Sequence, residues 1–163
     1  MWRVCTITLA MLLIGVQGCN KQPETGMTIT HSINGLRLSL PDTLLLDGKP
    51  ERPTVTESAA GFKVALGVET RRRVKVEASV VLRTAEVEPP GVWHGERNIS
   101  GRRIHYRIER EEGGSGGAQI DLYAWERCEN GYLEYSQGDI VEEPGNPDFS
   151  LVWTVIAATQ PPL

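Results

Sequence analysis

The sequence has few of the residues that metal and redox chemistry require. It contains three cysteines and three histidines, and His31, His94 and His105 show no metal-ligand spacing. It also has no Cys-x-x-Cys, His-Glu-x-x-His or phosphate-loop motif. These absences exclude the common zinc, dithiol and nucleotide-binding motifs.

The sequence offers no catalytic constellation either. Gly113–Gly117 places a serine between glycines but lacks the strand-to-helix context of a nucleophile elbow. Paired carboxylates occur at three places, Glu111-Glu112, Glu126 with Glu129, and Glu142-Glu143. We expect these carboxylates in loop-like, solvent-facing segments rather than in the cleft that a glycosidase needs. We therefore predict that the protein is not an enzyme. A small hydrolase would instead need a deep pocket with a perturbed carboxyl or a Ser–His pair.

Long apolar runs are also absent. The run from Val4 to Val16 has thirteen residues after Arg3, whereas a spanning helix needs about 20, so it suits the core of a signal peptide. It is followed by Gln17-Gly18-Cys19 and then by polar residues from Asn20. This stretch resembles a bacterial lipoprotein signal, although Gln17 stands where a small residue is more usual. The resemblance implies cleavage before Cys19 and lipidation of that cysteine.

Lipidation at Cys19 would place the domain in the periplasm, with the lipid as its only membrane attachment. The absence of Asp at position 20 favours the outer membrane under the sorting rule of that lipoprotein class. The alternative is an ordinary signal peptide that happens to end near a cysteine. We assign residues 1–18 to the signal peptide, 19–30 to the lipidated cysteine and tether, and 31–163 to one globular domain. Cys128 then has no partner for a disulfide, and we expect it to be a small buried apolar residue.

Charge is distributed unevenly along the chain. The segment from Lys63 to Arg110 has eleven Lys and Arg against six Asp and Glu, whereas the segment from Glu111 to Asp148 has ten acidic residues and one arginine. A clustered negative surface attracts cations and basic proteins and repels nucleic acid. The alternative is that these carboxylates only keep the domain soluble. We interpret the basic run Arg71–Arg73 as a solvated turn and expect no nucleic-acid partner.

Alternation of apolar and polar side chains with a period of two indicates β-strands. It occurs over residues 36–40, 62–68, 74–80, 104–108 and 120–125. We predict one antiparallel hairpin from the second and third of these runs and another from the last two. Asn130-Gly131 is a hairpin turn signal that leads into a further strand over residues 132–137.

The last element is predicted to be a helix. Asn146 can cap it, Pro147 suits the first helical position, and Asp148 complements the positive helix end. An apolar face at helical spacing should dock on the sheet, formed by Phe149, Val152, Trp153 and Ile156. The predicted fold is α+β, a mostly antiparallel sheet of about six or seven strands with one C-terminal helix packed on it.

The acidic segment also contains the aromatic side chains Tyr123, Trp125, Tyr132 and Tyr135, with Trp93 upstream. Tyr and Trp beside carboxylates are typical of protein interfaces, although one face of each strand could instead be core. Such a surface would suit a protein ligand with a cationic groove. Carboxylates at that interface could also complete the coordination of a calcium ion. Gly113–Gly117 is either a flexible connection or a segment that orders against a partner.

Together these features resemble a type VI secretion immunity lipoprotein. The resemblance rests on Cys19, on the opening strand Asn34-Gly35-Leu36-Arg37-Leu38-Ser39-Leu40-Pro41, on a hairpin that carries Trp125, and on Asp148-Phe149-Ser150-Leu151-Val152-Trp153 in the final helix. It implies a protein that binds a cognate toxin and occludes its active-site groove. The nearest similarity is to immunity proteins of peptidoglycan-degrading muramidases, whose complexes are calcium-assisted. It implies no other cofactor.

From this resemblance we expect a flexible tip and acidic strand ends to enter the groove of the toxin. The expected partner-binding residues are Gly114, Ser115, Gly116, Glu126, Glu129, Tyr132, Glu134 and Asp139. The alternative function is that of a structural or assembly lipoprotein in the cell envelope or a secretion apparatus. Immunity predicts one tight soluble partner, whereas a structural subunit predicts a membrane complex.

Overall fold

A computed structural model describes residues 27–46, 48–67, 76–84, 94–113, 117–129, 131–142 and 146–162. The predicted lipidation site and glycine-rich tip, Cys19, Gly114, Ser115 and Gly116, lie outside these residues, as do the leader and Arg71–Arg73. Within the described ranges, no helix has the length and apolar character needed to cross a bilayer.

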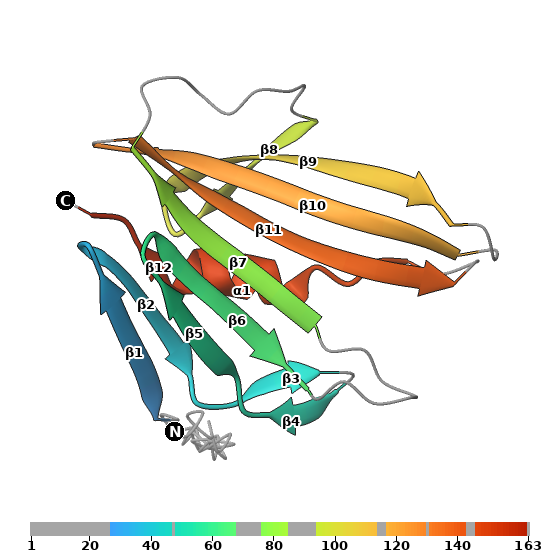
Figure 1. Cartoon of the computed structure of the whole chain (residues 1–163), viewed down its shortest axis with the longest axis horizontal. Coiled ribbons are helices and arrows are strands. Elements are labelled where there is room, and N and C mark those ends of the chain that lie inside the picture. The colour runs from blue at the N-terminus through green and yellow to red at the C-terminus, as the bar shows by residue number, and fades with distance from the viewer. Residues whose placement is uncertain are drawn as a thin grey trace, which may run out of the picture.

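The main element of the fold is an antiparallel sheet of seven strands in the order β5-β6-β7-β11-β10-β9-β8 (Figure 1). Its strands are β5 (Thr54–Ser58), β6 (Gly61–Leu66), β7 (Val76–Arg83), β8 (Gly95–Ile99), β9 (Arg102–Glu112), β10 (Gly117–Cys128) and β11 (Gly131–Glu142). The predicted hairpins are confirmed, because β6 pairs with β7 and β9 pairs with β10. The turn signal at residues 130–131 is also confirmed, since β10 and β11 pair through Cys128 and Gly131.

Two smaller sheets and one helix complete the described part of the chain. The strands are β1 (Thr28–Ile33), β2 (Leu36–Pro41), β3 (Leu44–Leu46), β4 (Lys49–Glu51) and β12 (Thr159–Gln160), and the helix is α1 (Ser150–Ala158). β1, β2 and β12 form one sheet, and β3 pairs with β4. α1 contacts β2 as well as β7 and β11, and Figure 1 shows it crossing behind β7. Because β1 begins at Thr28, the folded domain starts before the predicted boundary at residue 31.

The core lies between the inner face of the large sheet, α1 and the small sheet. The predicted alternation of Leu36, Leu38 and Leu40 is confirmed, since all three are fully buried. In β10, Ile120, Leu122 and Ala124 are buried on the inner face, so the period of two holds there as well. Alternation over 104–108 holds only in part, because Ile108 is 39% exposed. β8 pairs with β9 as far as Tyr106, and beyond it the Ile108 amide donates to His94 Nδ1 at 3.4 Å.

The predicted helix start is wrong. α1 begins at Ser150 after Phe149, and no side chain at that N-cap position makes a capping hydrogen bond. The preceding residue is held by the sheet instead, because the Asp148 amide donates to Asp139 and the Asp148 carbonyl accepts from Gln137. Asp148 still assists the helix start, since its Oδ1 accepts from the Ser150 amide at 2.8 Å. The prediction of a C-terminal helix that docks on the sheet is therefore confirmed, but the helix begins later than predicted, at Ser150.

Candidate functional site

Side chains that point away from α1 form what we call the outer face of the seven-stranded sheet. Its charged residues pair across and along the strands. Arg83 on β7 reaches Glu134 on β11 at 2.6 Å, and Lys63 on β6 lies 3.4 Å from Glu77 on β7. A further outer-face pair within β9 is Arg107 with Glu109. Arg110 and Glu112 also pair within β9, but they have the parity of the inward-facing Ile104. The acidic segment therefore does not form a separate negative surface, because strand pairing interleaves it with the basic one.

The predicted partner-binding residues within the described ranges are not brought together. Glu129 is exposed at the turn between β10 and β11, whereas Asp139 lies near the far end of β11. Strands rise about 3.3 Å per residue, so Tyr132 and Asp139 are about 23 Å apart along β11. Tyr132 is buried and packs edge-on against Trp125, and Glu134 is paired with Arg83. These residues therefore do not form a single acidic surface.

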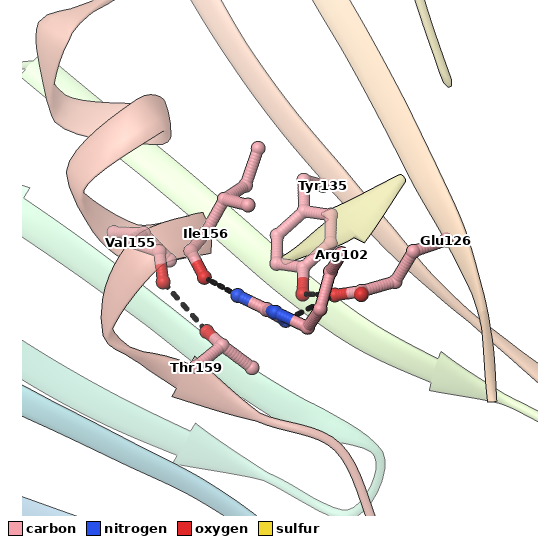
Figure 2. A network of polar contacts seen from close by, with 6 residues as sticks. All are labelled: Arg102, Glu126, Tyr135, Val155, Ile156 and Thr159. Atoms are coloured by element: carbon pink, nitrogen blue, oxygen red, sulfur yellow. Dashed lines mark hydrogen bonds and ion pairs between the residues drawn. The ribbon is translucent and has the colours of Figure 1, made fainter. Parts of the chain in front are cut away.

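The prediction that Glu126 faces solvent is wrong. Only 3% of Glu126 is exposed, because it shares the inner face of β10 with Leu122 and Ala124. Arg102 Nη1 and the Tyr135 hydroxyl both donate to its Oε1, each at 2.5 Å. Figure 2 shows this network beside the C-terminal end of α1, where Arg102 Nη2 also donates to the Ile156 carbonyl.

Burial controls the electrostatics of this network. It raises the pKa of Glu126, while the hydrogen bond from Tyr135 and the charge of Arg102 act in the opposite direction. Burial also raises the pKa of Tyr135 well above its usual value, and the adjacent Glu126 charge adds to that effect. Tyr135 is therefore a neutral donor. The Arg102 cation at the helix C-terminus also complements the negative end of the helix dipole. The network links the sheet to the helix, and Glu126 is buried within it.

Two aromatic side chains of β10 point to the outer face but are covered. His105 stacks on Trp125 with ring centroids 4.7 Å apart, and the guanidinium of Arg107 lies 5.0 Å from the Tyr123 ring. Trp125 is only 3% exposed as a result. His105 is half-buried and also lies 3.2 Å from Glu96. Trp125 therefore serves as packing in this structure rather than as an exposed anchor.

The outer face carries one open hollow of about 460 Å³ that crosses β6, β7, β10 and β11. We call it the polar trough, and the residues that line it include Lys63, Ser79, Asp121, Ser136, Gly138 and Ile140. Burial, followed by the negative charge of Asp121, raises the pKa of Tyr123 beside this trough. Sequence reasoning missed it, because its residues come from four strands and meet only through the register of the sheet.

Two other expectations concern metal binding and Cys128. In the part of the chain that the structure describes, no three His, Cys, Asp or Glu side chains come together as metal ligands. Cys128 lies at the end of β10 and is half-buried rather than fully buried as expected. It lies at the edge of a second hollow of about 450 Å³, formed with Asn34, Leu82 and Pro162.

Comparison with known proteins identifies the family. The sequence model of the family described as "Type six secretion immunity 3 domain" matches residues 48–160. The chain is also similar to the protein named "Immune protein Tsi3" of Pseudomonas aeruginosa strain PAO1, with 25% identity over 156 residues, which span 93% of this chain and 94% of that protein. Because the family match covers well over half of the sequence, this chain belongs to the type six secretion immunity 3 family.

Proposed function

We propose that this protein acts in the periplasm, where it binds a cognate type VI secretion toxin and occludes its active-site groove. The proposed toxin class is a peptidoglycan-degrading muramidase. The observation that carries the proposal is the family match over residues 48–160, which includes the seven-stranded sheet and α1. Membership of an immunity family implies a cognate toxin as partner.

The structure supports inhibition by a surface rather than by chemistry. The sheet is continuous over seven strands, and its buried network ties it to α1. Such a rigid face loses little conformational entropy on binding, which favours tight association. The outer face is also rich in polar and charged side chains that can select one partner.

Co-expression with a candidate cognate toxin tests this function. We expect cells that export the toxin to the periplasm to survive only when the immunity protein is exported as well. The purified proteins should form a soluble complex, and the complex should not hydrolyse purified peptidoglycan. Unchanged hydrolysis by the mixture, or recovery of the protein only in a membrane assembly, would contradict the proposal.

We also propose that Cys19 carries the lipid anchor and that the anchor lies in the outer membrane. Replacing Cys19 by serine should abolish incorporation of labelled palmitate and release the protein into the soluble periplasmic fraction, because the thiol is the acylated group. Cys128→Ser is the matched control, since it removes the only other cysteine beyond the leader and should leave labelling unchanged. Equal labelling of wild type and Cys19→Ser would exclude this anchor.

Calcium at the toxin interface remains part of the proposal. Oxygen ligands from both proteins would complete its coordination. Chelation with EDTA should then weaken the complex, and calcium, but not magnesium at the same concentration, should restore it. If chelation does not change the affinity, calcium has no role in the complex.

A further inference from the structure

The polar trough has a floor of small side chains. Ser79 on β7 and Ser136 on β11 face each other with their hydroxyl oxygens 2.7 Å apart. Gly138 continues the floor along β11 and has no side chain to fill the space. Larger residues surround this floor and make it a recess. The recess is open to solvent and has a volume of about 460 Å³. A protruding side chain of another protein can therefore enter it.

The two sides of the trough differ in charge. On one side Lys63 and Glu77 form an ion pair at 3.4 Å and largely cancel each other. On the other side stands Asp121, whose carboxylate oxygens accept from Gln119 Nε2, at 3.2 and 3.1 Å. No cationic side chain of the described residues lies within ion-pair distance of Asp121. Asp139 also lines the trough, but its Oδ2 accepts from the backbone amide of Asp148 near the start of α1. Asp121 is therefore the carboxylate of the trough whose printed hydrogen bonds all come from one neutral side chain.

The position of Asp121 depends on Gly138. The two residues are directly opposite each other in the register of β10 and β11. A Cβ at position 138 would lie 2.5 Å from Asp121 Oδ1, which is closer than atoms can approach. Glycine at this position thus allows the carboxylate to lie over β11 at the side of the trough. The negative charge and the open space are parts of one feature.

The rim of the trough carries an apolar contact. Ile140 is 67% exposed and is among the largest exposed hydrophobic side chains of the described residues. In an interface, apolar contacts around a charged pair exclude water from it. Because Ile140 and Asp121 flank the same recess, one protruding side chain could contact both.

We propose that the polar trough receives a basic side chain, arginine or lysine, from the cognate toxin, with Asp121 as its counter-charge. The inference rests on the proposed immunity function and names the contact through which it acts. A guanidinium or ammonium group complements the carboxylate, and its remaining N–H groups can donate to the hydroxyl oxygens of Ser79 and Ser136. The aliphatic stem of the same side chain packs against Ile140.

The proposal is tested by measuring the affinity of trough variants for the toxin. Asp121→Asn keeps the shape of the side chain and removes its charge, and it should weaken binding by about 30-fold or more, the lower range for truncating one partner of a desolvated charge pair. Gly138→Ala keeps every charge but forces the carboxylate from its position, so a comparable loss is expected. Asp42→Asn makes the same chemical change after β2, outside the seven-stranded sheet, and should change affinity by less than about 3-fold. Urea unfolding of each variant verifies that it is folded.

The outcomes separate this inference from the proposed function. If wild type fails to bind or inhibit the toxin, the immunity function itself is wrong. If wild type binds and Asp121→Asn binds equally well, only the trough is wrong. Loss of affinity in Glu129→Gln but not in Asp121→Asn would place the contact at the turn end of the hairpin instead. If Asp121→Asn alters self-association of the free protein and not toxin binding, the occupant is a second copy, and the proposal is again overturned.

Discussion

Replacing Arg102 by methionine should lower the free energy of unfolding at neutral pH by about 3–5 kcal/mol. Methionine has a similar length, so the main change is loss of the cation. The Glu126 carboxylate would then remain in the core, 3% exposed, without a counter-charge. The carbonyl of Ile156 would also lose its guanidinium donor at the end of α1. Urea unfolding followed by tryptophan fluorescence measures this loss.

The defect should shrink in acid. Burial already raises the pKa of Glu126 in the folded protein, and Arg102 opposes that shift. Without Arg102 the folded-state pKa rises further. A carboxyl with a raised folded-state pKa binds protons more tightly when folded, so stability increases as pH falls through that value. The stability of Arg102→Met relative to wild type should therefore recover as the pH falls from neutral towards the ordinary pKa range of a carboxyl group.

Arg103→Met is the matched control for this prediction. Arg103 is the next residue on β9, but its side chain is 74% exposed and lies 3.7 Å from Glu96. Exposed ion pairs contribute about 0–1 kcal/mol, so we expect a correspondingly small change that varies little with pH. If both variants lost the same stability, or if Arg102→Met showed no dependence on pH, the buried network would not have the role assigned to it.

Much of the fold follows from local patterns in the sequence. Leu36, Leu38 and Leu40 alternate with polar residues because one face of β2 is buried, and the same rule found both strands of each predicted hairpin. The alternation in β10 also contained the information that was overlooked at Glu126. This residue has the parity of Leu122 and Ala124, so the pattern places it in the core despite its charge.

The sequence alone does not show which residue compensates the buried charge of Glu126. Arg102 is 24 positions away along the chain and belongs to a different strand. Which strands become neighbours depends on the tertiary fold, and so does the pairing of Arg83 with Glu134 across 51 positions. The polar trough has the same origin, because Ser79 meets Ser136 only when β7 pairs with β11. The counting of charges along the sequence therefore suggested a negative surface that strand pairing removes.

The helix start shows how tertiary contacts override local signals. Asn146-Pro147-Asp148 has the residues of a helix N-terminus, yet α1 begins at Ser150. Asp139 and Gln137 on β11 hold the backbone of Asp148 by hydrogen bonds from the sheet. The cap of α1 is thus partly supplied by a strand.

Replacing Gln137 by leucine should lower the free energy of unfolding by about 2–4 kcal/mol. Gln137 is 2% exposed, and its amide makes two hydrogen bonds with the start of α1. Its Nε2 donates to the Asp148 carbonyl at 2.6 Å, and its Oε1 accepts from the Val152 amide at 2.8 Å. Leucine fills the same space but leaves both backbone groups without these partners. Each unsatisfied buried group costs about 1–3 kcal/mol.

Hydrogen exchange locates this effect within the molecule. The Val152 amide is one of the first N–H groups of α1, which have no partner inside the helix. Its exchange should accelerate in Gln137→Leu more than that of amides in the centre of β10. Gln160→Leu is the matched control, because Gln160 is exposed on β12 and the same substitution there should change stability by less than about 0.5 kcal/mol. Wild-type protection of the Val152 amide in Gln137→Leu would show that the strand does not cap the helix, and that the late start of α1 has another cause.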